Sequence, residues 1–415
     1  KWENLPTIKG SLSDGLLKAL DSKPKVEKKI ETTNPEAYEF YLKAKHKYEK
    51  RENTDDIEIV RGLLNKAIEL DGNLVVAKVH LGNTFRNIGD YDKSIEIYSS
   101  ALKQSEELGD KRGIVSCLIS TGNYYSAKTN YDKAIEYYNR SLELSEELED
   151  YHNRGVVYYN TGLVYFNLCE YKMALDHFKR ASKVYKRMND KRGVGDVINC
   201  MGNIFKEQGE KEKALEHYAE SLKISEKCGN KRHVGMILSN IGNVYKGMGK
   251  YGRALDYYKR SLNIHKEIGD KLGVGVVSLS IGNLYIDKVN YSKAQDYHAN
   301  SLKIFEELGN KRGMGFTFNN IGILNYGKGD IDTALNYFER SLKINKEISN
   351  KTVIAWDLCC IGAIYVIKCK YKSAKEKLEK SLNIQKEIGK KDLLLQTTTY
   401  LYLTYKHLGK QYDKK

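Results

Sequence analysis

Apolar residues recur along most of the chain at three- and four-residue steps, which is the spacing of one face of an α-helix. Between residues 110 and 150, one apolar stripe runs from Ile114 to Tyr125 and a second runs from Ala134 to Leu148. A short polar turn separates the two stripes. The pattern therefore predicts a pair of amphipathic helices joined by a tight turn, each burying one face.

The same pattern returns every 40 residues, which makes the chain a tandem repeat. A glycine stands in the middle of each predicted first helix, and an aromatic residue follows three positions later in every unit but one. The chance that eight glycines fall in this register is on the order of one in a billion. The glycines are Gly82, Gly122, Gly162, Gly202, Gly242, Gly282, Gly322 and Gly362; a column in the second helix holds Tyr98, Tyr138, Phe178, Tyr218, Tyr258, His298, Phe338 and Leu378.

Local signals delimit the predicted helices. Each first helix is expected to begin after an Asp or Asn whose side chain can cap it. Glycines mark the corner between the two helices in several units, where a left-handed residue ends a helix. Because one pair cannot bury its apolar stripes alone, neighbouring pairs must stack into a solenoid. The caps are Asp110, Asp150, Asp190, Asn230, Asp270, Asn310 and Asn350, and the corner glycines are Gly89, Gly209, Gly249 and Gly329.

The repeat unit resembles the tetratricopeptide repeat in the runs Gly242 to Tyr245 (GNVY), Gly249 to Tyr258 (GKYGRALDYY) and Ser261-Leu262. The 40-residue period and the hinge from Gly109 to Gly113 (GDKRG) resemble the Pins/LGN-type scaffolds and many bacterial signalling repeats. The resemblance covers about residues 35–415. It implies an all-α, right-handed superhelical solenoid of antiparallel helix pairs that acts as a scaffold or sensor module for a protein partner.

The repeats divide the chain into four parts. Residues 1–34 lack the repeat columns and are expected to be a linker or the end of an upstream domain, and residues 35–72 form one short repeat. Residues 73–390 hold eight repeats of about 40 residues. Residues 391–415 are either a partial last repeat, with a second helix beginning near Gly409, or a capping helix.

The first residues carry a second resemblance. The runs Trp2 to Ile8 (WENLPTI) and Thr33 to Leu42 (TNPEAYEFYL) resemble the junction in bacterial proteins that place a class III adenylate/guanylate cyclase domain upstream of such repeats. That resemblance implies an alternative function, in which this chain is the regulatory C-terminal region of a cyclase whose catalytic domain lies before Lys1.

Composition narrows the functional classes. The chain has three prolines and none after Pro35, as expected for a nearly all-helical protein. Seven cysteines without a C-x-x-C pair indicate reduced thiols in a cytoplasmic protein. The net charge of +15 raises nucleic-acid binding, but lysines alternate with glutamates instead of forming a patch, so this is the least favoured function.

Catalytic, cofactor and metal sites are not expected. The glycines do not follow a phosphate-binding spacing. The nine histidines are scattered, and His177 and His217 occupy a column that holds tyrosine in other units. No nucleophile stands beside a base in a recurring pattern, so we expect no cofactor, no metal and no catalysis by this chain.

One polar column does not fit packing. Asparagine is a poor helix former, yet it follows the central glycine in five units. Arginines eleven positions earlier share its helix face, and lysines three positions later share it in two units. Amides and cations together suit the backbone and acidic side chains of an extended peptide. We predict a concave peptide-binding face formed by Asn83, Asn123, Asn203, Asn243, Asn283, Arg112, Arg192, Arg232, Arg312, Lys206 and Lys246.

The alternative interpretation is structural. Each asparagine could instead bond a carbonyl of a neighbouring helix and hold the repeats in register, and the arginines could be solvated hinge residues. Only in that case would replacing the amides with alanine destabilise the protein. The column is interrupted at Leu163, Ile323 and Ala363, so residues 191–290 are the expected binding stretch. A second polar column, three residues earlier, holds His80, Asn160, Asn240 and Asn320.

Overall fold

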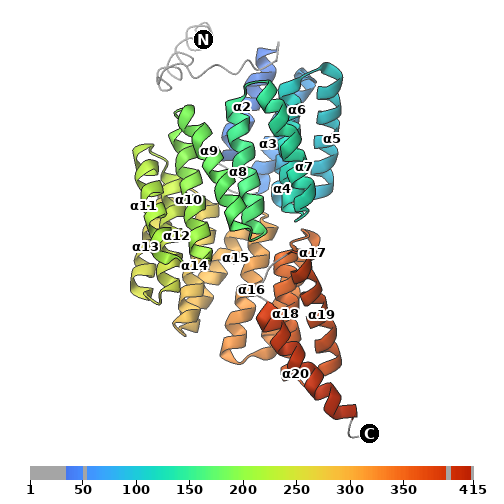
Figure 1. Ribbon diagram of the computed structural model, residues 1–415, viewed down its shortest axis with the longest axis vertical. Helices are drawn as coiled ribbons and strands as arrows, with labels where there is room; N and C mark the ends of the chain where they lie inside the picture. Colours follow the sequence, from blue (N-terminus) through green and yellow to red (C-terminus); the bar gives the residue numbers. More distant parts are fainter. Residues whose placement is uncertain (1–33, 50–53, 389–393, 413–415) are drawn as a thin grey trace, which may run out of the picture.

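The computed structural model describes residues 34–49, 54–388 and 394–412, and within these ranges it contains nineteen α-helices and no strand. Consecutive helices form antiparallel pairs that stack along the chain (Figure 1). The expected all-α solenoid is therefore confirmed. The first helices are α2 (Pro35–Glu49), α4 (Val75–Ile88), α6 (Lys111–Ala127), α8 (Tyr151–Asn167), α10 (Lys191–Glu207), α12 (Lys231–Gly247), α14 (Lys271–Asp287), α16 (Lys311–Lys328), α18 (Lys351–Ile367) and α20 (Leu394–Tyr412). The second helices are α3 (Thr54–Leu70), α5 (Tyr91–Leu108), α7 (Tyr131–Glu147), α9 (Tyr171–Arg187), α11 (Lys211–Lys227), α13 (Tyr251–Glu267), α15 (Tyr291–Glu307), α17 (Ile331–Glu347) and α19 (Tyr371–Glu387).

The two ends of the chain compare differently with the sequence predictions. Residues 1–33 lie outside the described residues, so the linker and the cyclase junction stay predictions. Helices α2 and α3 occupy the stretch assigned to the short first repeat. Helix α20 continues through Gly409 to Tyr412, so among the described residues no second helix begins near that glycine, although one of the two predictions for residues 391–415 required one.

Side-chain caps set where the first helices begin. An oxygen of Asp110 accepts a hydrogen bond from the backbone N–H of Gly113 at 2.8 Å, which satisfies one of the free donors of the first turn. The caps predicted in the six following units make the same bond to the third residue after them. Six predicted start positions are thereby confirmed along with that of α6.

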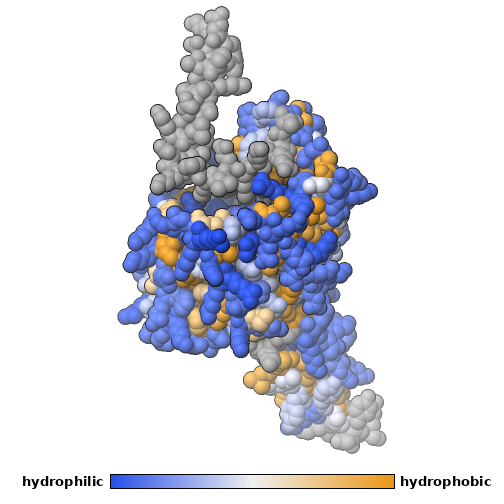
Figure 2. Space-filling model, turned by 45° about the horizontal axis from the view of Figure 1, so that its top comes forward, coloured by the Kyte–Doolittle hydropathy of each residue, from blue (hydrophilic) through white to orange (hydrophobic). Residues whose placement is uncertain are grey.

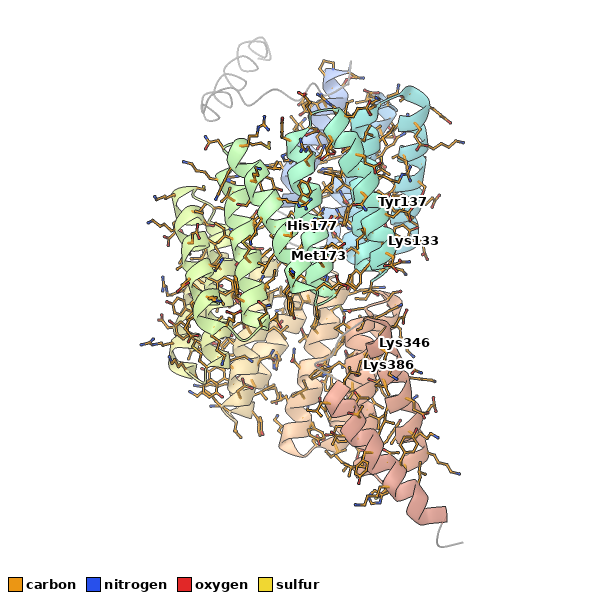
Figure 3. All side chains as sticks on the ribbon, in the orientation of Figure 1. Lys133, Tyr137, Met173, His177, Lys346 and Lys386 are labelled. Atoms are coloured by element: carbon orange, nitrogen blue, oxygen red, sulfur yellow. The ribbon has the colours of Figure 1, made fainter. Side chains whose placement is uncertain are left out.

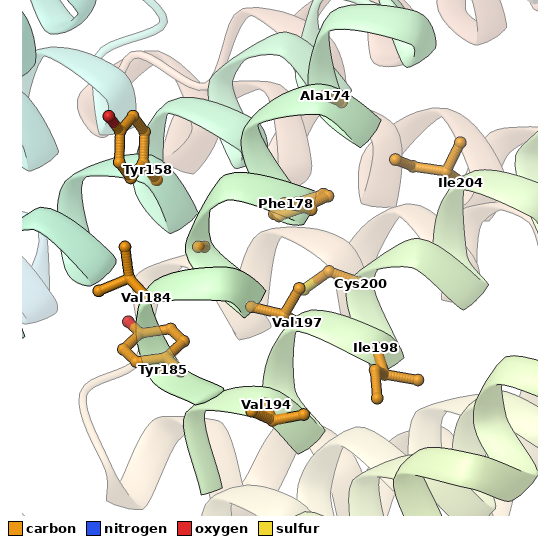
Figure 4. Packing of buried hydrophobic residues seen from close by; sticks show 11 residues of the cluster. Tyr158, Ala174, Phe178, Val184, Tyr185, Val194, Val197, Ile198, Cys200 and Ile204 are labelled. Atoms are coloured by element: carbon orange, nitrogen blue, oxygen red, sulfur yellow. The ribbon is translucent and has the colours of Figure 1, made fainter. Parts of the chain in front are cut away.

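The central glycines bring the two helices of a repeat into contact. A Cβ atom added to Gly242 would lie 2.6 Å from Cε1 of Tyr258, so the tyrosine ring rests directly on the glycine backbone. Tyr258 is fully buried there. The same contact recurs between Gly162 and Phe178, and Figure 4 shows Phe178 packed between Ala174 and Val197. The glycine column and the aromatic column are two halves of one contact.

The stack curves because its two sides are packed unequally. First helices of consecutive repeats pack against one another, whereas second helices pack mainly against first helices. The first helices therefore line the concave side. In Figure 1, α11 and α13 lie at one edge of the molecule and α5 lies at the opposite edge, with α10 and α12 further inside.

The curvature brings distant repeats together. The Nζ atom of Lys128 donates a hydrogen bond to Oγ of Ser349 at 2.9 Å, across 221 residues of sequence. A methyl group of Ile348 packs on Gly89, so closely that an added Cβ would lie 2.8 Å away. Figure 1 accordingly shows α6 and α7 directly above α17. The first turn of the superhelix thus rests on the second.

The outer surface is mostly hydrophilic, with small scattered apolar areas (Figure 2). Figure 3 labels Lys133 and Tyr137 on α7 and Met173 and His177 on α9, the second helices of consecutive repeats. Among the described residues, none of the helices combines the length and the apolar character needed to cross a membrane.

Ion pairs recur where the start of a first helix lies beside the end of the second helix of the same repeat. The lysine that begins a first helix meets a glutamate 36 residues later, near the end of the second helix, in five units. In Lys311–Glu347 the atoms are 3.0 Å apart. All these pairs are exposed, so each contributes less than about 1 kcal/mol to stability. In three of these units the lysine directly precedes an arginine of the predicted binding face, as in Lys311-Arg312.

The corner residue Val289 offers a test of backbone strain. It adopts a φ of 57°, in the left-handed region that a β-branched residue rarely occupies, and its side chain is 67% exposed. We expect Val289→Gly to raise the free energy of unfolding by about 1 kcal/mol, because it removes the strain and loses little packing. Gly249, with a φ of 72°, occupies the equivalent corner. Gly249→Val is the matched control and should lower stability in urea denaturation; a gain in both variants would contradict the strain argument.

Candidate functional site

Side chains at four positions of each first helix point away from the helix pair and toward the concave side. In α10 these are Arg192, Asp196, Asn203 and Lys206, which follow one another by four, seven and three residues and so lie on one helix face. The equivalent residues of α12 are Arg232, Met236, Asn243 and Lys246. We call the surface formed by these positions in the first helices the inner face.

The asparagines of the inner face bind buried tyrosines. The hydroxyl of Tyr258 donates a hydrogen bond to Oδ1 of Asn243 at 2.6 Å. The same bond, at 2.6 or 2.7 Å, joins the tyrosine of the second helix to the asparagine in three other repeats: Tyr98 to Asn83, Tyr138 to Asn123 and Tyr218 to Asn203. The asparagine therefore satisfies a hydroxyl group that would otherwise be buried without a partner.

The interruptions of the asparagine column have the same cause. Leu163 stands where the second helix carries Phe178, and Ile323 stands where it carries Phe338. Neither phenylalanine has a hydroxyl to satisfy. Ala363 similarly faces Leu378. The structural alternative was thus right to give the amide an internal bond, but wrong about the partner, which is a tyrosine of the same repeat and not a neighbouring carbonyl.

The repeat with Asn283 departs from the others. Its second helix carries His298, and burial lowers the pKa of this histidine to about 4, so the ring is neutral at pH 7. Among the described residues, Oδ1 of Asn283 and both ring nitrogens of His298 are buried without a hydrogen-bond partner. The amide column extends into this repeat, but the bond that fixes it elsewhere is missing.

The second polar column links neighbouring repeats. Nδ2 of Asn160 donates to Oδ1 of Asn123 at 3.1 Å, and Nδ2 of Asn240 donates to Asn199 at 3.0 Å. Each bond joins first helices of adjacent repeats. These residues therefore perform the register-holding role that the sequence suggested for the main column.

Three of the cations predicted to flank the asparagines have ion-pair partners. Nε of Arg232 lies 3.2 Å from a carboxylate oxygen of Asp270, and Nζ of Lys246 lies 3.3 Å from Asp287. Lys206 pairs with its neighbour Glu207 at 2.9 Å. These pairs are partly exposed and can exchange partners at small cost.

Three arginines complete the cation set, each exposed at the start of its helix. Burial, reinforced by Asp190, raises the pKa of Asp196 to about 6, and Arg192 partly opposes this rise. The Arg312 guanidinium lies 6.0 Å from the centre of the Phe316 ring. Arg112 occupies the equivalent place in α6.

The sequence analysis missed an apolar strip on the inner face. Met236, Val276 and Phe316 are 48%, 47% and 37% exposed and occupy equivalent positions in α12, α14 and α16. Each stands four residues after the arginine column, or after Leu272 in α14. Comparing the residues four positions after each arginine would have revealed this apolar strip in the sequence.

One grouping of Ser225, His233 and Asp196 has the residue types of a hydrolytic triad. Both the serine oxygen, at 2.8 Å, and the carboxylate, at 3.1 Å, approach the same ring nitrogen, Nδ1. A triad needs the two partners on opposite nitrogens. The serine is also buried and donates to the carbonyl of Ser221, so this cluster serves packing. In the described part of the chain, no three potential metal ligands cluster together.

The chain resembles known proteins in sequence pattern and in fold. The tetratricopeptide repeat family model matches residues 74–147, 122–187, 194–267 and 275–347. A solved Rap protein complexed with competence and sporulation factor is similar with a TM-score of 0.60 and 16% identity, covering 85% of this chain and 99% of that one. Aspartyl phosphate phosphatase F from Bacillus subtilis gives 0.55 and 12%, covering 85% and 94%. No curated protein matches the sequence. At these identities the structural similarity concerns the fold alone.

The tyrosine–asparagine bond predicts a specific stability pattern. Asn243→Ala should lower the free energy of unfolding by about 1–3 kcal/mol, because the Tyr258 hydroxyl loses its partner. The double variant Asn243→Leu with Tyr258→Phe reproduces the natural pair Leu163 and Phe178. It should recover most of the free energy of unfolding that Asn243→Ala loses. Urea denaturation of the single and double variants measures this coupling. An Asn243→Ala variant as stable as the wild type would show that the hydroxyl does not need the amide.

Beneath the inner face, Asp357 predicts a pH dependence. This fully buried carboxyl accepts hydrogen bonds from Asn319 at 2.7 Å and Ser341 at 2.8 Å, and burial raises its pKa to about 7. Because the folded pKa lies above the unfolded one, folding favours the protonated form, and this stabilisation is lost as the pH rises toward 7. Asp357→Asn should therefore become increasingly more stable than the wild type between pH 5 and pH 8, by up to about 1.4 kcal/mol per unit of pKa shift.

Urea denaturation at each pH checks this prediction. The matched control is Asp256→Asn, at an exposed aspartate of α13. Buried His80 and His233, with pKa values lowered to about 4, contribute equally to all three proteins and cancel in the comparison. A pH-independent difference for Asp357→Asn would contradict the raised pKa.

Proposed function

Because the chain belongs to the tetratricopeptide repeat family, we propose that its inner face binds an extended, acidic segment of another protein, so that the chain acts as a scaffold or sensor module. The Pins/LGN-type assignment and the cyclase alternative stay predictions from the sequence.

The observation that carries this proposal is the orientation of the amides. Since the tyrosine hydroxyls donate to Oδ1 of Asn203 and Asn243, the Nδ2 groups must point the other way. Within the described residues these two nitrogens make no hydrogen bond, and they are not among the buried unpaired atoms. Donors fixed in advance lose little entropy on binding the carbonyls of an extended backbone. The structural bond and the binding role therefore support each other.

Charge supports an acidic partner. Arg192, Arg232 and Arg312 lie at one end of the first helices, and Lys206 and Lys246 lie at the other end of the same face. Asp196 is the carboxylate among them in α10, and its raised pKa weakens its charge near pH 6. The chain as a whole carries a net charge of +15. A segment with acidic side chains would be attracted over a long range and held at both ends of the face.

The structural neighbours are compatible with this function. The Rap protein of similar fold was solved as a complex with competence and sporulation factor. The curled stack described above also brings the corner after α6 into contact with the corner after α17, across several repeats. A bound segment would contact several repeats at once.

A swap taken from the chain itself tests the amides without unfolding the protein. The variant combines Asn203→Leu and Asn243→Leu with Tyr218→Phe and Tyr258→Phe. It removes the amide donors of both asparagines but leaves no tyrosine hydroxyl without a partner. We expect this variant to melt within a few degrees of the wild type and to lose at least tenfold in affinity for acidic 12-residue peptides selected from a random library, measured by fluorescence anisotropy. The control carries only the two Tyr→Phe changes; it keeps the amide donors but frees their orientation, so it should lose less affinity than the full swap.

Charge is tested separately. Arg192→Gln with Arg312→Gln should weaken binding of the same peptides, and raising the salt from 50 to 500 mM should weaken the wild-type complex, because exposed charges are screened. Lys103→Gln with Lys223→Gln, on the outer helices α5 and α11, is the control. Selection of neutral or basic peptides, or equal binding by the swapped and wild-type proteins, would refute the proposal.

A further inference from the structure

A pocket opens at the C-terminal part of the inner face, between three consecutive first helices. It has a volume of about 170 Å³. Its lining residues occupy inner-face positions: Ile323 and Ala363 stand in the asparagine column, and Trp356 stands in the strip of Met236. Tyr400 and Gln396 of α20 close the far side. The pocket therefore continues the surface proposed to bind a protein segment.

The pocket is mostly apolar and carries no charged side chain. Ile323, Phe338 and Ala363 contribute hydrocarbon, and burial raises the pKa of the Cys360 thiol well above its usual value, so the thiol stays neutral. Polar groups of Tyr326, Tyr400 and Gln396 also belong to the lining, but most of its surface is hydrocarbon, and an apolar cavity of about 150 Å³ in another protein binds benzene. The pocket is thus suited to a compact apolar group.

The position of the pocket selects its occupant. Trp356 and Gln396 stand in the strip of Met236, and Ile323 and Ala363 stand in the asparagine column, so the pocket lies on the inner face itself. A segment bound along that face passes the pocket and can place a side chain in it.

We propose that this pocket receives one aromatic or large aliphatic side chain of the segment bound on the inner face. The inference rests on the proposed function and adds to it an anchor residue. The partner would then combine acidic residues over α10 and α12 with one apolar residue at α18. The change from asparagine to Ile323 and Ala363 marks the boundary between the two parts.

The first experiment tests the pocket without any peptide. Trp2→Phe leaves Trp356 as the single tryptophan of the full chain, and toluene serves as the probe. Toluene should shift the Trp356 emission saturably to shorter wavelength. Ala363→Phe, which fills the pocket, should abolish the saturable shift. If this variant does not fold, the smaller substitution Ala363→Met takes its place and should reduce the shift. The matched control is Leu163→Phe, which places the same ring in the same column of α8, and should leave the shift unchanged.

The second experiment uses the 12-residue peptides selected on the wild-type protein. They should share one aromatic or large aliphatic residue at a fixed distance from their acidic residues. Replacing this peptide residue with alanine should weaken binding to the wild-type protein roughly 10- to 100-fold. The same replacement should weaken binding to the Ala363→Phe variant by less than about twofold, because its pocket is already filled.

The outcomes separate the two proposals. Peptides that bind without a shared apolar residue, or that bind Ala363→Phe as tightly as the wild type, would overturn the anchor and leave the proposed function intact. The absence of a saturable toluene shift would also overturn it. If no peptide is selected at all, the proposed function fails and the anchor fails with it, even where toluene binds.

Discussion

The contact between a glycine of the first helix and a ring of the second is the constraint on which the rest of the repeat depends. With a Cβ in place, atoms would approach to 2.6 Å at Gly242, so the helices could not adopt their present separation. That separation determines how far apart the first helices of successive repeats lie, and the difference between the two sides of the stack produces the curvature. A change in this helix separation, repeated in eight units, would alter the whole superhelix, and the contact accordingly recurs with little variation.

The same contact determines which residue stands on the inner face. A tyrosine ring that reaches across the glycine carries its hydroxyl to the first helix, one residue beyond the glycine, and the oxygen of an asparagine meets it there. A phenylalanine makes no such demand, and leucine or isoleucine takes the place of the amide. The pattern of the inner face is thus inherited from the core. The proposed binding uses the Nδ2 half of each amide group, which packing leaves without a partner among the described residues.

The sequence predicted what is periodic and local. The 40-residue spacing, the Asp and Asn caps and the paired helices required only patterns within one unit, and the described residues confirm them. The tyrosine–asparagine bond was present in the sequence as two columns whose interruptions coincide, at Leu163 with Phe178 and at Ile323 with Phe338. It was missed because the asparagines were compared with the glycines beside them and not with the second helix. The contact between Lys128 and Ser349 has no periodic signal, since it depends on small rotations accumulated over several repeats.

The inner face is therefore not uniform, and its differences follow from substitutions in the core. Where the second helix supplies Tyr218 and Tyr258, the face presents fixed amide donors. Where it supplies Phe338 and Leu378, the facing positions are the apolar Ile323 and Ala363, and the small side chain of Ala363 borders the same pocket as Trp356 and Tyr400. A repeat protein can in this way diversify its binding surface through residues that never touch the ligand. When the tyrosine of the core is replaced by a residue without a hydroxyl, the facing position of the inner face no longer needs an asparagine. That position can then carry an apolar side chain.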